Sequence, residues 1–318
     1  VKELRLTHTN AYPFFRFKEP FKQLLPLSNI PNSKIVYCNE TGKYFIFESD
    51  KHGFNNSNKF WELKELDAVF LGDSFTHGAC SENNQGFSRQ LSKSYKILNL
   101  SVGGNSSVSN YAILKEYAIN TNPKRIIWFH FENDISGNII DKKNKILKKY
   151  IYNKNFKKNL IKKNSEIEKV SINKFNSIQE FNNNSKNNKE SFFNINTFKF
   201  KNIRALFRVF LPKSKDIFES YDLLESLLRD SKKILQKQNI DIVFVSIPSH
   251  LGLQKKHYFH EKKINSTLEK VKIKHYNLKK FFEREENPFE YYQFHQYGGH
   301  FSSKGNKFVA NLVKEIID

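Results

Sequence analysis

The stretch "FLGDSFTHGAC", residues 70–80, decides how this chain folds. Its apolar start runs into Gly-Asp-Ser, as a buried strand does when it ends in a tight turn. In open α/β sheets, ligands bind beyond the carboxyl ends of the strands, and the turn after the first strand commonly carries a reacting group. Ser74 is therefore either a nucleophile at a strand end or the N-cap of the helix that follows.

Short apolar runs without alternation repeat along the chain from Asp67 onward. They are typical of strands covered on both faces, and they occupy residues 67–71, 96–100, 125–131, 241–247 and, more weakly, 272–278. Helical patterns separate these runs. Because parallel neighbouring strands need crossover connections, the sequence predicts a three-layer α/β/α domain with a doubly wound parallel sheet.

Two segments depart from this pattern. Residues 1–65 are mixed and rich in aromatics, and we expect an N-terminal extension packed on an α/β domain that spans residues 66–318. Residues from about 140 to 215 are dominated by Lys and Asn and predict an insertion. Its first half can form an amphipathic helix, whereas its Asn-rich half cannot bury enough surface to order itself. The insertion is either a lid beside the active site or a surface excursion without a role.

The formal charge of +21 comes mainly from lysine. Nucleic-acid grooves usually rely on Arg and on aromatics interleaved with basic residues, so we expect solvated surface and no nucleic-acid partner. No stretch approaches the roughly 20 apolar residues of a membrane span. A membrane tether preceding Val1 stays open, and so does the choice between a cytoplasmic and a cell-envelope location. Cys38 and Cys80 can form at most one bridge.

Four separated blocks resemble the SGNH, or GDSL-type, hydrolases. The blocks are "GDSFT" (72–76), "NLSVGGNSS" (99–107), "FENDI" (131–135) and "GGHFSSKGN" (298–306). "FESDKHGFNN" also resembles a turn that precedes the catalytic domain in a bacterial subgroup of the family. The resemblance implies a flavodoxin-like fold and a serine esterase or O-acyltransferase without metal or cofactor. Its expected substrate is a small acyl ester or an acylated carbohydrate, with acetyl groups of a glycan as one candidate.

The resemblance also implies a role for one residue in each block. Ser74 is the nucleophile and His300 the base, while the oxyanion hole is formed by Ser74, by Gly104, with Gly103 as the fallback, and by Asn133. The two glycines could instead form only a tight turn, and Asn133 could cap the segment that follows the third strand.

Several neighbouring residues have weaker roles. We expect His77, Gly103 and Phe131 near the pocket, and we assign Asp134 to structure. His295 is the rival of His300, which is preferred because a cap and turn follow it directly. His257 and His260 lack a third ligand at a recognisable spacing, so no metal site is expected.

Two positions differ from the family pattern. Phe131 stands where the family usually has Gly, and Tyr297 stands where it has the Asp that orients the base. His300 is then oriented by a backbone carbonyl or by a carboxylate that the sequence does not identify. The missing Asp favours an alternative function, a catalytically weak or inactive carbohydrate-binding protein. A third hypothesis is a binder of anionic polymers that uses the lysine excess.

Overall fold

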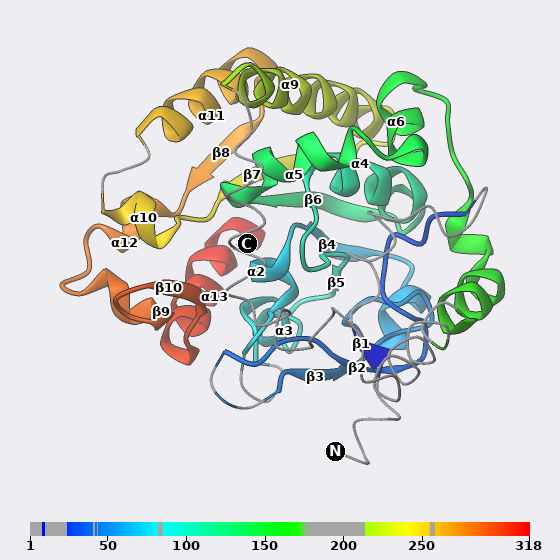
Figure 1. Ribbon diagram of the computed structural model, residues 1–318, viewed down its shortest axis with the longest axis horizontal. Helices are drawn as coiled ribbons and strands as arrows, with labels where there is room; N and C mark the ends of the chain where they lie inside the picture. The colour runs from blue at the N-terminus through cyan, green and yellow to red at the C-terminus, as the bar shows by residue number, and fades with distance from the viewer. Residues whose placement is uncertain are drawn as a thin grey trace, which may run out of the picture.

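A parallel sheet forms the centre of the computed structural model (Figure 1). The structure describes residues 8–9, 24–40, 42, 44–81, 85–173, 176, 214–254 and 258–318. The strands of the sheet are β4 (Leu66–Leu71), β5 (Ile97–Asn99), β6 (Pro123–His130), β7 (Asp241–Ser246) and β8 (Lys274–Asn277). All neighbours pair in parallel, in the order β5-β4-β6-β7-β8. This is the flavodoxin-like order, and the predicted fold class is confirmed.

Helices cover both faces of the sheet (Figure 1). One face packs against α4 (Ser107–Glu116), α5 (Asn133–Asp141), α9 (Ser214–Gln236) and α11 (Tyr258–Val271). The other packs against α3 (Phe87–Leu91), α12 (Lys279–Phe282) and α13 (Ser303–Ile317). On β4, Val69 belongs to the first core and Phe70 to the second. Because both faces of each strand are buried, its sequence shows an unbroken apolar run.

A smaller sheet lies beside the domain near the N-terminus. It consists of β1 (His8–Thr9), β2 (Lys34–Val36) and β3 (Ile46–Glu48), with β2 parallel to β1 and antiparallel to β3. The turn that follows is organised by Asp50, which accepts hydrogen bonds from His52 N, Phe54 N, Asn56 Nδ2 and Trp61 Nε1.

Asn56 docks this turn onto β5, an edge strand of the central sheet. Its amide nitrogen donates to Asn99 O, and its amide oxygen accepts from Asn99 N, both at 2.9 Å. The side chain thereby satisfies backbone groups of β5 that have no further strand to pair with. The 3-10 helix η2 (Asn58–Glu62) then leads into β4.

The described part of the insertion packs on the domain. Helix α6 (Lys145–Tyr152) buries Leu147 and Tyr150, as its amphipathic pattern predicts, and Tyr150 Oη donates to Glu116 Oε1 at 2.6 Å. The 3-10 helix η5 (Leu160–Lys162) and a helical segment at 164–173 follow. The Asn-rich half, and with it the choice between a lid and a surface excursion, lies outside the described residues. None of the described helices is long and apolar enough to span a membrane.

The remaining elements are short, and all of them except the 3-10 helix that leads into β6 lie around the carboxyl edge of the sheet. They are α2 (Ser74–His77), the 3-10 helix η4 (Ala118–Asn120), α10 (His250–Leu253), the 3-10 helix η7 (Pro288–Tyr291), and the antiparallel hairpin of β9 (Tyr292–Phe294) and β10 (Gly298–Phe301). This hairpin leads directly into α13, so the last block of the sequence lies beside the first.

Candidate active site

Ser74 lies at the first position of α2, just beyond the carboxyl end of β4. The N-cap of this helix is Asp73, whose Oδ1 accepts from Phe75 N at 3.0 Å. The alternative that Ser74 is only the cap is therefore wrong. Ser74 as a whole is 7% exposed, and its Oγ makes no hydrogen bond to any other described residue. Its hydroxyl is thus placed at the sheet edge without a structural partner.

The surroundings of Asp73 shift the pKa of its carboxyl group. Burial, and next the negative charge of Asp134, raises the pKa of Asp73 to about 7. Asp134 is fully buried after β6, where it accepts from His130 Nδ1 at 3.0 Å and from Phe131 N at 3.4 Å. These bonds fit the structural role that the sequence suggests for Asp134.

His300 lies on β10, with its ring against the segment that carries Ser74. The centroid of the imidazole is 5.1 Å from the ring centroid of Phe75, the residue directly after Ser74. The hairpin and α2 are in contact. The first and last blocks, far apart along the chain, therefore meet at one end of the sheet.

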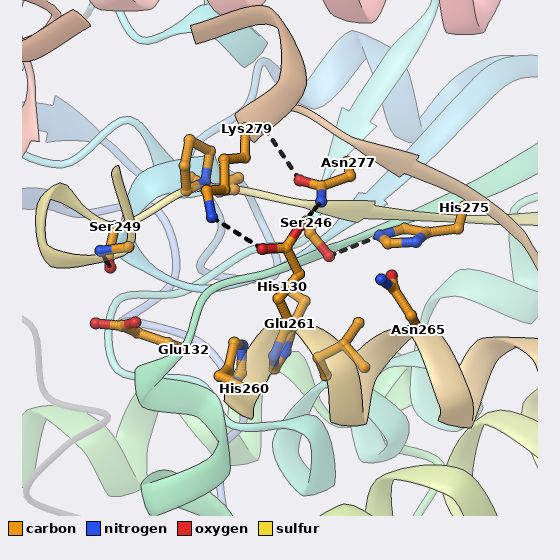
Figure 2. Close-up of a pocket in the computed structure, with 14 residues that line it drawn as sticks. His130, Glu132, Ser246, Ser249, His260, Glu261, Asn265, His275, Asn277 and Lys279 are labelled. Atoms are coloured by element: carbon orange, nitrogen blue, oxygen red, sulfur yellow. Dashed lines mark hydrogen bonds and ion pairs between the residues drawn. The ribbon is translucent and has the colours of Figure 1, made fainter. Parts of the chain in front are cut away.

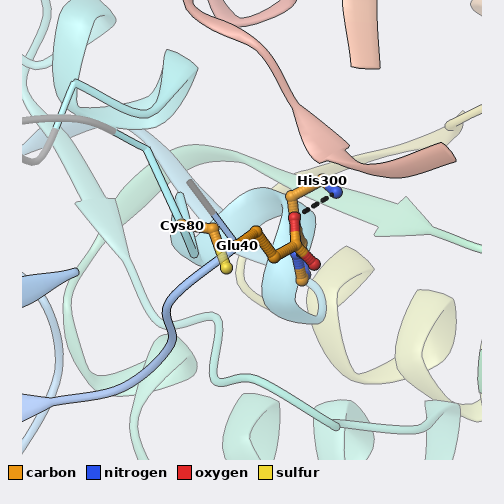
Figure 3. A group of neighbouring side chains, drawn as sticks. All are labelled: Glu40, Cys80 and His300. Carbon is orange, nitrogen blue, oxygen red and sulfur yellow. Dashed lines mark hydrogen bonds and ion pairs between the residues drawn. The ribbon is translucent and has the colours of Figure 1, made fainter. Parts of the chain in front are cut away.

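Glu40 places a carboxylate beside His300 (Figure 3). Its Oε1 is 2.9 Å from His300 Nδ1, and its Oε2 accepts from the His300 backbone N–H, also at 2.9 Å. Tyr297 is 79% exposed. A carboxylate at Nδ1 holds the proton on that nitrogen, which leaves Nε2 as the proton acceptor of the neutral ring. The described residues offer Nε2 no hydrogen-bond partner.

The loop after β5 reaches the turn that precedes Ser74. Asn105 Nδ2 donates to Gly72 O at 3.1 Å and so joins the first and second blocks. Gly104 is exposed and has a φ of +81°, in the left-handed region that favours glycine. Gly103 is glycine because of close packing. A Cβ at this position would lie 1.9 Å from the Tyr37 hydroxyl.

Asn133 is the first residue of α5, directly beyond β6 at the same edge of the sheet. The N-cap of this helix is Glu132, so the capping alternative for Asn133 is wrong. Its side chain is exposed. The oxyanion roles of Gly104 and Asn133 stay proposals, which the placement of their segments favours.

Phe131 covers one side of Phe75. The two rings lie 4.3 Å apart between centroids with an interplanar angle of 30°. Phe75 in turn contacts His300, so the Phe that replaces the usual Gly becomes part of an aromatic row beside the proposed base. This row places an aromatic ring directly beside the imidazole of His300.

His77 is the last residue of α2, and it is buried. Its ring is 1% exposed and meets the edges of Tyr37, Phe45 and Phe47, with centroid distances between 4.9 and 5.8 Å. Burial, and next the charge of His300, lowers the pKa of His77 to about 3. Neither ring nitrogen has a partner among the described residues. A ring enclosed in this way cannot line an open pocket, so the expected pocket role of His77 is not supported.

The other histidines have local partners. His295 is exposed, and its carbonyl oxygen lies 2.8 Å from His250 Nε2. His260 Nδ1 lies 2.7 Å from the Tyr221 hydroxyl, and His257 is outside the described residues. Among the described residues, one group has three side chains close enough to hold a metal, namely Glu40, Cys80 and His300. Its sulfur is tied up in a disulfide with Cys38, so this group lacks a free thiolate.

A cavity of about 50 Å³ lies at the carboxyl ends of β6, β7 and β8 (Figure 2). Its lining includes His130, His260, His275, Glu261 and Lys279. Burial lowers the pKa of His130 to about 3 and that of His275 to about 4, so both rings are neutral near pH 7. The polar side chains that line the cavity place hydrogen-bonding groups at the same sheet edge as Ser74.

Comparisons with known proteins give matches to solved structures and none to family models or curated proteins. No family model matches the sequence, and no curated protein matches it. The chain is similar to solved structures of GDSL-type hydrolases. These include an acetyl xylan esterase, AlAXEase (TM-score 0.45, 14% identity, 79% of this chain and 99% of that one), and a GDSL-like lipase from Bacteroides thetaiotaomicron (0.42, 13%, 82% and 90%). A third is a lipase/acylhydrolase from Enterococcus faecalis (0.40, 12%, 80% and 96%).

These similarities are distant, and activity and substrate do not follow from them. The strand order of the chain and the placement of its four blocks are the observations that favour the resemblance to SGNH hydrolases. Glu40 is the residue of the site that the block pattern misses, because it lies in the extension, 260 positions before His300.

Proposed function

We propose that this chain is a serine ester hydrolase of the SGNH type, with Ser74 as nucleophile, His300 as base and Glu40 as the acid that orients the base. The observation that carries the proposal is the Glu40–His300 pair, which lies beside Phe75 and therefore beside the nucleophile turn. A serine needs such a base, and the base needs an orienting group, before the hydroxyl can attack an ester.

The reaction would proceed through an acyl-enzyme. His300 Nε2 takes the proton of Ser74 Oγ while Oγ attacks the ester carbonyl, and Glu40 stabilises the imidazolium that forms. The imidazolium returns the proton to the leaving alcohol. Water, or the hydroxyl of an acceptor, then attacks the acyl group with the same base. The N–H groups of Ser74 and Gly104 and the amide of Asn133 are the proposed donors to the oxyanion.

The surroundings favour a small acyl group on a polar carrier. We expect the aromatic rings of the Phe131–Phe75 row, which contacts His300, to favour a short acyl group over a long chain. The neutral imidazoles and the Lys279–Glu261 ion pair that line the cavity at the ends of β6, β7 and β8 can form hydrogen bonds to hydroxyl groups. An acylated carbohydrate fits both features, with water as acceptor in an esterase and a sugar hydroxyl as acceptor in an O-acyltransferase.

The non-catalytic alternative loses its main argument. The absence of an acid at position 297 favours a binding protein, but Glu40 holds both the Nδ1 atom and the backbone N–H of His300. A purely binding cleft has no need of this arrangement. Binding of anionic polymers by the lysine-rich surface has no further observation in its favour.

The test is hydrolysis of an aryl acetate by purified variants. We expect Ser74→Ala and His300→Ala to abolish turnover above background. The exposed serine Ser94 and the exposed histidine His295 provide matched controls, and Ser94→Ala and His295→Ala should keep wild-type rates. Turnover that survives in Ser74→Ala would refute the proposed function.

A further inference from the structure

The disulfide between Cys38 and Cys80 joins the segment that bears the acid to the segment that bears the nucleophile. Cys38 precedes Glu40 by two residues, and Cys80 follows Ser74 by six. Cys80 Sγ, a carboxylate oxygen of Glu40 and an imidazole nitrogen of His300 all lie within 4.8 Å of one another (Figure 3). The covalent link therefore lies directly beside the acid–base pair.

Cys80 is also fixed to the other two parts of the site. Ala79 N donates to Ser74 O at 2.9 Å, which ties the residue before Cys80 to the start of α2. Gln293 Nε2 on β9 donates to Cys80 O at 3.3 Å and to Phe301 O at 3.0 Å, on the strand that carries His300. Hydrogen bonds thus connect the Cys80 segment to α2 and to the β9–β10 hairpin. The disulfide connects this segment to Cys38, just before Glu40.

Glu40 lies in the loop of the hairpin formed by β2 and β3, beyond the residues that these strands pair. Among the described residues, the backbone pairing that continues from β2 and β3 reaches Cys38, whose carbonyl oxygen accepts from Phe45 N at 2.7 Å. Releasing even one loop residue from a single backbone conformation lowers the population of that conformation about tenfold. A covalent link two residues before Glu40 restrains the segment that bears the acid.

We propose that the Cys38–Cys80 disulfide is a positioning element of the active site, which holds Glu40 against His300 and thereby supports catalysis. The inference rests on the proposed function. It makes the two cysteines positioning residues, since neither has a role in the proposed bond changes.

An aromatic cluster packs the β2–β3 hairpin against α2, which gives an alternative mechanism for positioning Glu40. The rings of Tyr37, Phe45 and Phe47 pack around His77 on α2. If this packing alone fixes Glu40, the disulfide contributes to global stability and nothing to catalysis. The two mechanisms predict different results when the disulfide is removed and Glu40 is kept.

The test is a double-mutant cycle on aryl acetate hydrolysis. The variants are Cys38→Ala/Cys80→Ala, Glu40→Gln and the combination of all three changes. We expect the loss of the disulfide to lower kcat about tenfold with little change in KM, and to cost nothing further once Glu40 is Gln. Equal losses in both backgrounds, or no loss in either, would overturn the proposal. Near-UV circular dichroism confirms that each variant is folded at the assay temperature.

Dithiothreitol gives a second measurement on the wild-type chain. The reagent passes two electrons and two protons to the disulfide and becomes a cyclic disulfide, while Cys38 and Cys80 become thiols. Activity should fall on reduction, return on reoxidation, and be insensitive to the reagent in Glu40→Gln. If the reduced protein and the double alanine variant both unfold, the disulfide serves the fold and the proposal is refuted. An inactive wild type would instead refute the proposed function on which it rests.

Discussion

Replacing Glu40 by Gln should disable the enzyme while leaving the fold intact. The side chains of Glu40 and His300 are 23% and 19% exposed, so the pair is only partly screened by water. The carboxylate makes two hydrogen bonds to His300 at 2.9 Å, and such charge-assisted bonds are worth about 1.5–3 kcal/mol each. One of them, to Nδ1, strengthens when the imidazole becomes positive.

The loss should therefore be at least about a hundredfold in kcat, which corresponds to about 3 kcal/mol of barrier. Gln can also donate its amide N–H to Nδ1, which places the ring proton on Nε2 and prevents that nitrogen from acting as base. In that case the loss approaches the roughly 10⁴-fold effect of the wrong tautomer. Since Glu40 is not proposed to contact the substrate, KM should change little.

The assay is steady-state hydrolysis of an aryl acetate with kcat and KM determined separately. Glu48→Gln is the matched control, because Glu48 lies exposed on β3 of the same hairpin and should keep its wild-type rate. Glu40→Asp should recover part of the activity that Gln removes. A loss of less than about threefold in Glu40→Gln would refute the assignment of the orienting acid.

Three further predictions concern neighbouring residues. Asn133→Ala should lower kcat about 10²- to 10³-fold by removing a proposed oxyanion donor, measured with the same ester. Tyr297→Ala should leave the rate within about twofold of wild type, because this exposed side chain takes no part in the triad. His77→Leu should increase the free energy of unfolding by about 2 kcal/mol more at about pH 5 than at about pH 8. The His77 ring stays neutral in the fold down to a pKa of about 3 but is protonated in the unfolded chain below about 6.5, so wild type loses stability as the pH falls through this range. Urea unfolding at the two pH values measures the difference, and an equal effect at both would contradict the buried, neutral ring.

The fold could be predicted because its signals are local. The run before Ser74 is apolar at successive positions, since Val69 and Phe70 face different cores, and that pattern separates a buried strand from a half-exposed one. The same holds for the predicted strands at 125–131 and 241–247, which the structure places at Pro123–His130 and Asp241–Ser246.

The orienting acid could not be predicted in this way. Glu40 contacts His300 only through tertiary structure, across 260 positions, and a glutamate in a polar turn has no local feature that separates it from a solvated one. One indirect signal was present. Had the two cysteines been paired, Cys80 would have brought Cys38, and with it Glu40, next to the nucleophile segment.

His77 shows the opposite limitation. Its position three residues after Ser74 suggested a place near the pocket, but side chains of a short helix point in different directions. Here the ring points into the aromatic cluster formed by β2, β3 and the residues that flank them. Which side of α2 would be covered depended on where the N-terminal hairpin packs, and no local pattern contains that information.

The most direct test of the convergence of Ser74, His300 and Glu40 is the site and rate of reaction with a fluorophosphonate, mapped by peptide mass spectrometry. The account predicts one adduct, on Ser74, whose formation is slowed strongly in His300→Ala and in Glu40→Gln. An adduct on another residue, or equal labelling of Ser74 in all three proteins, would contradict it.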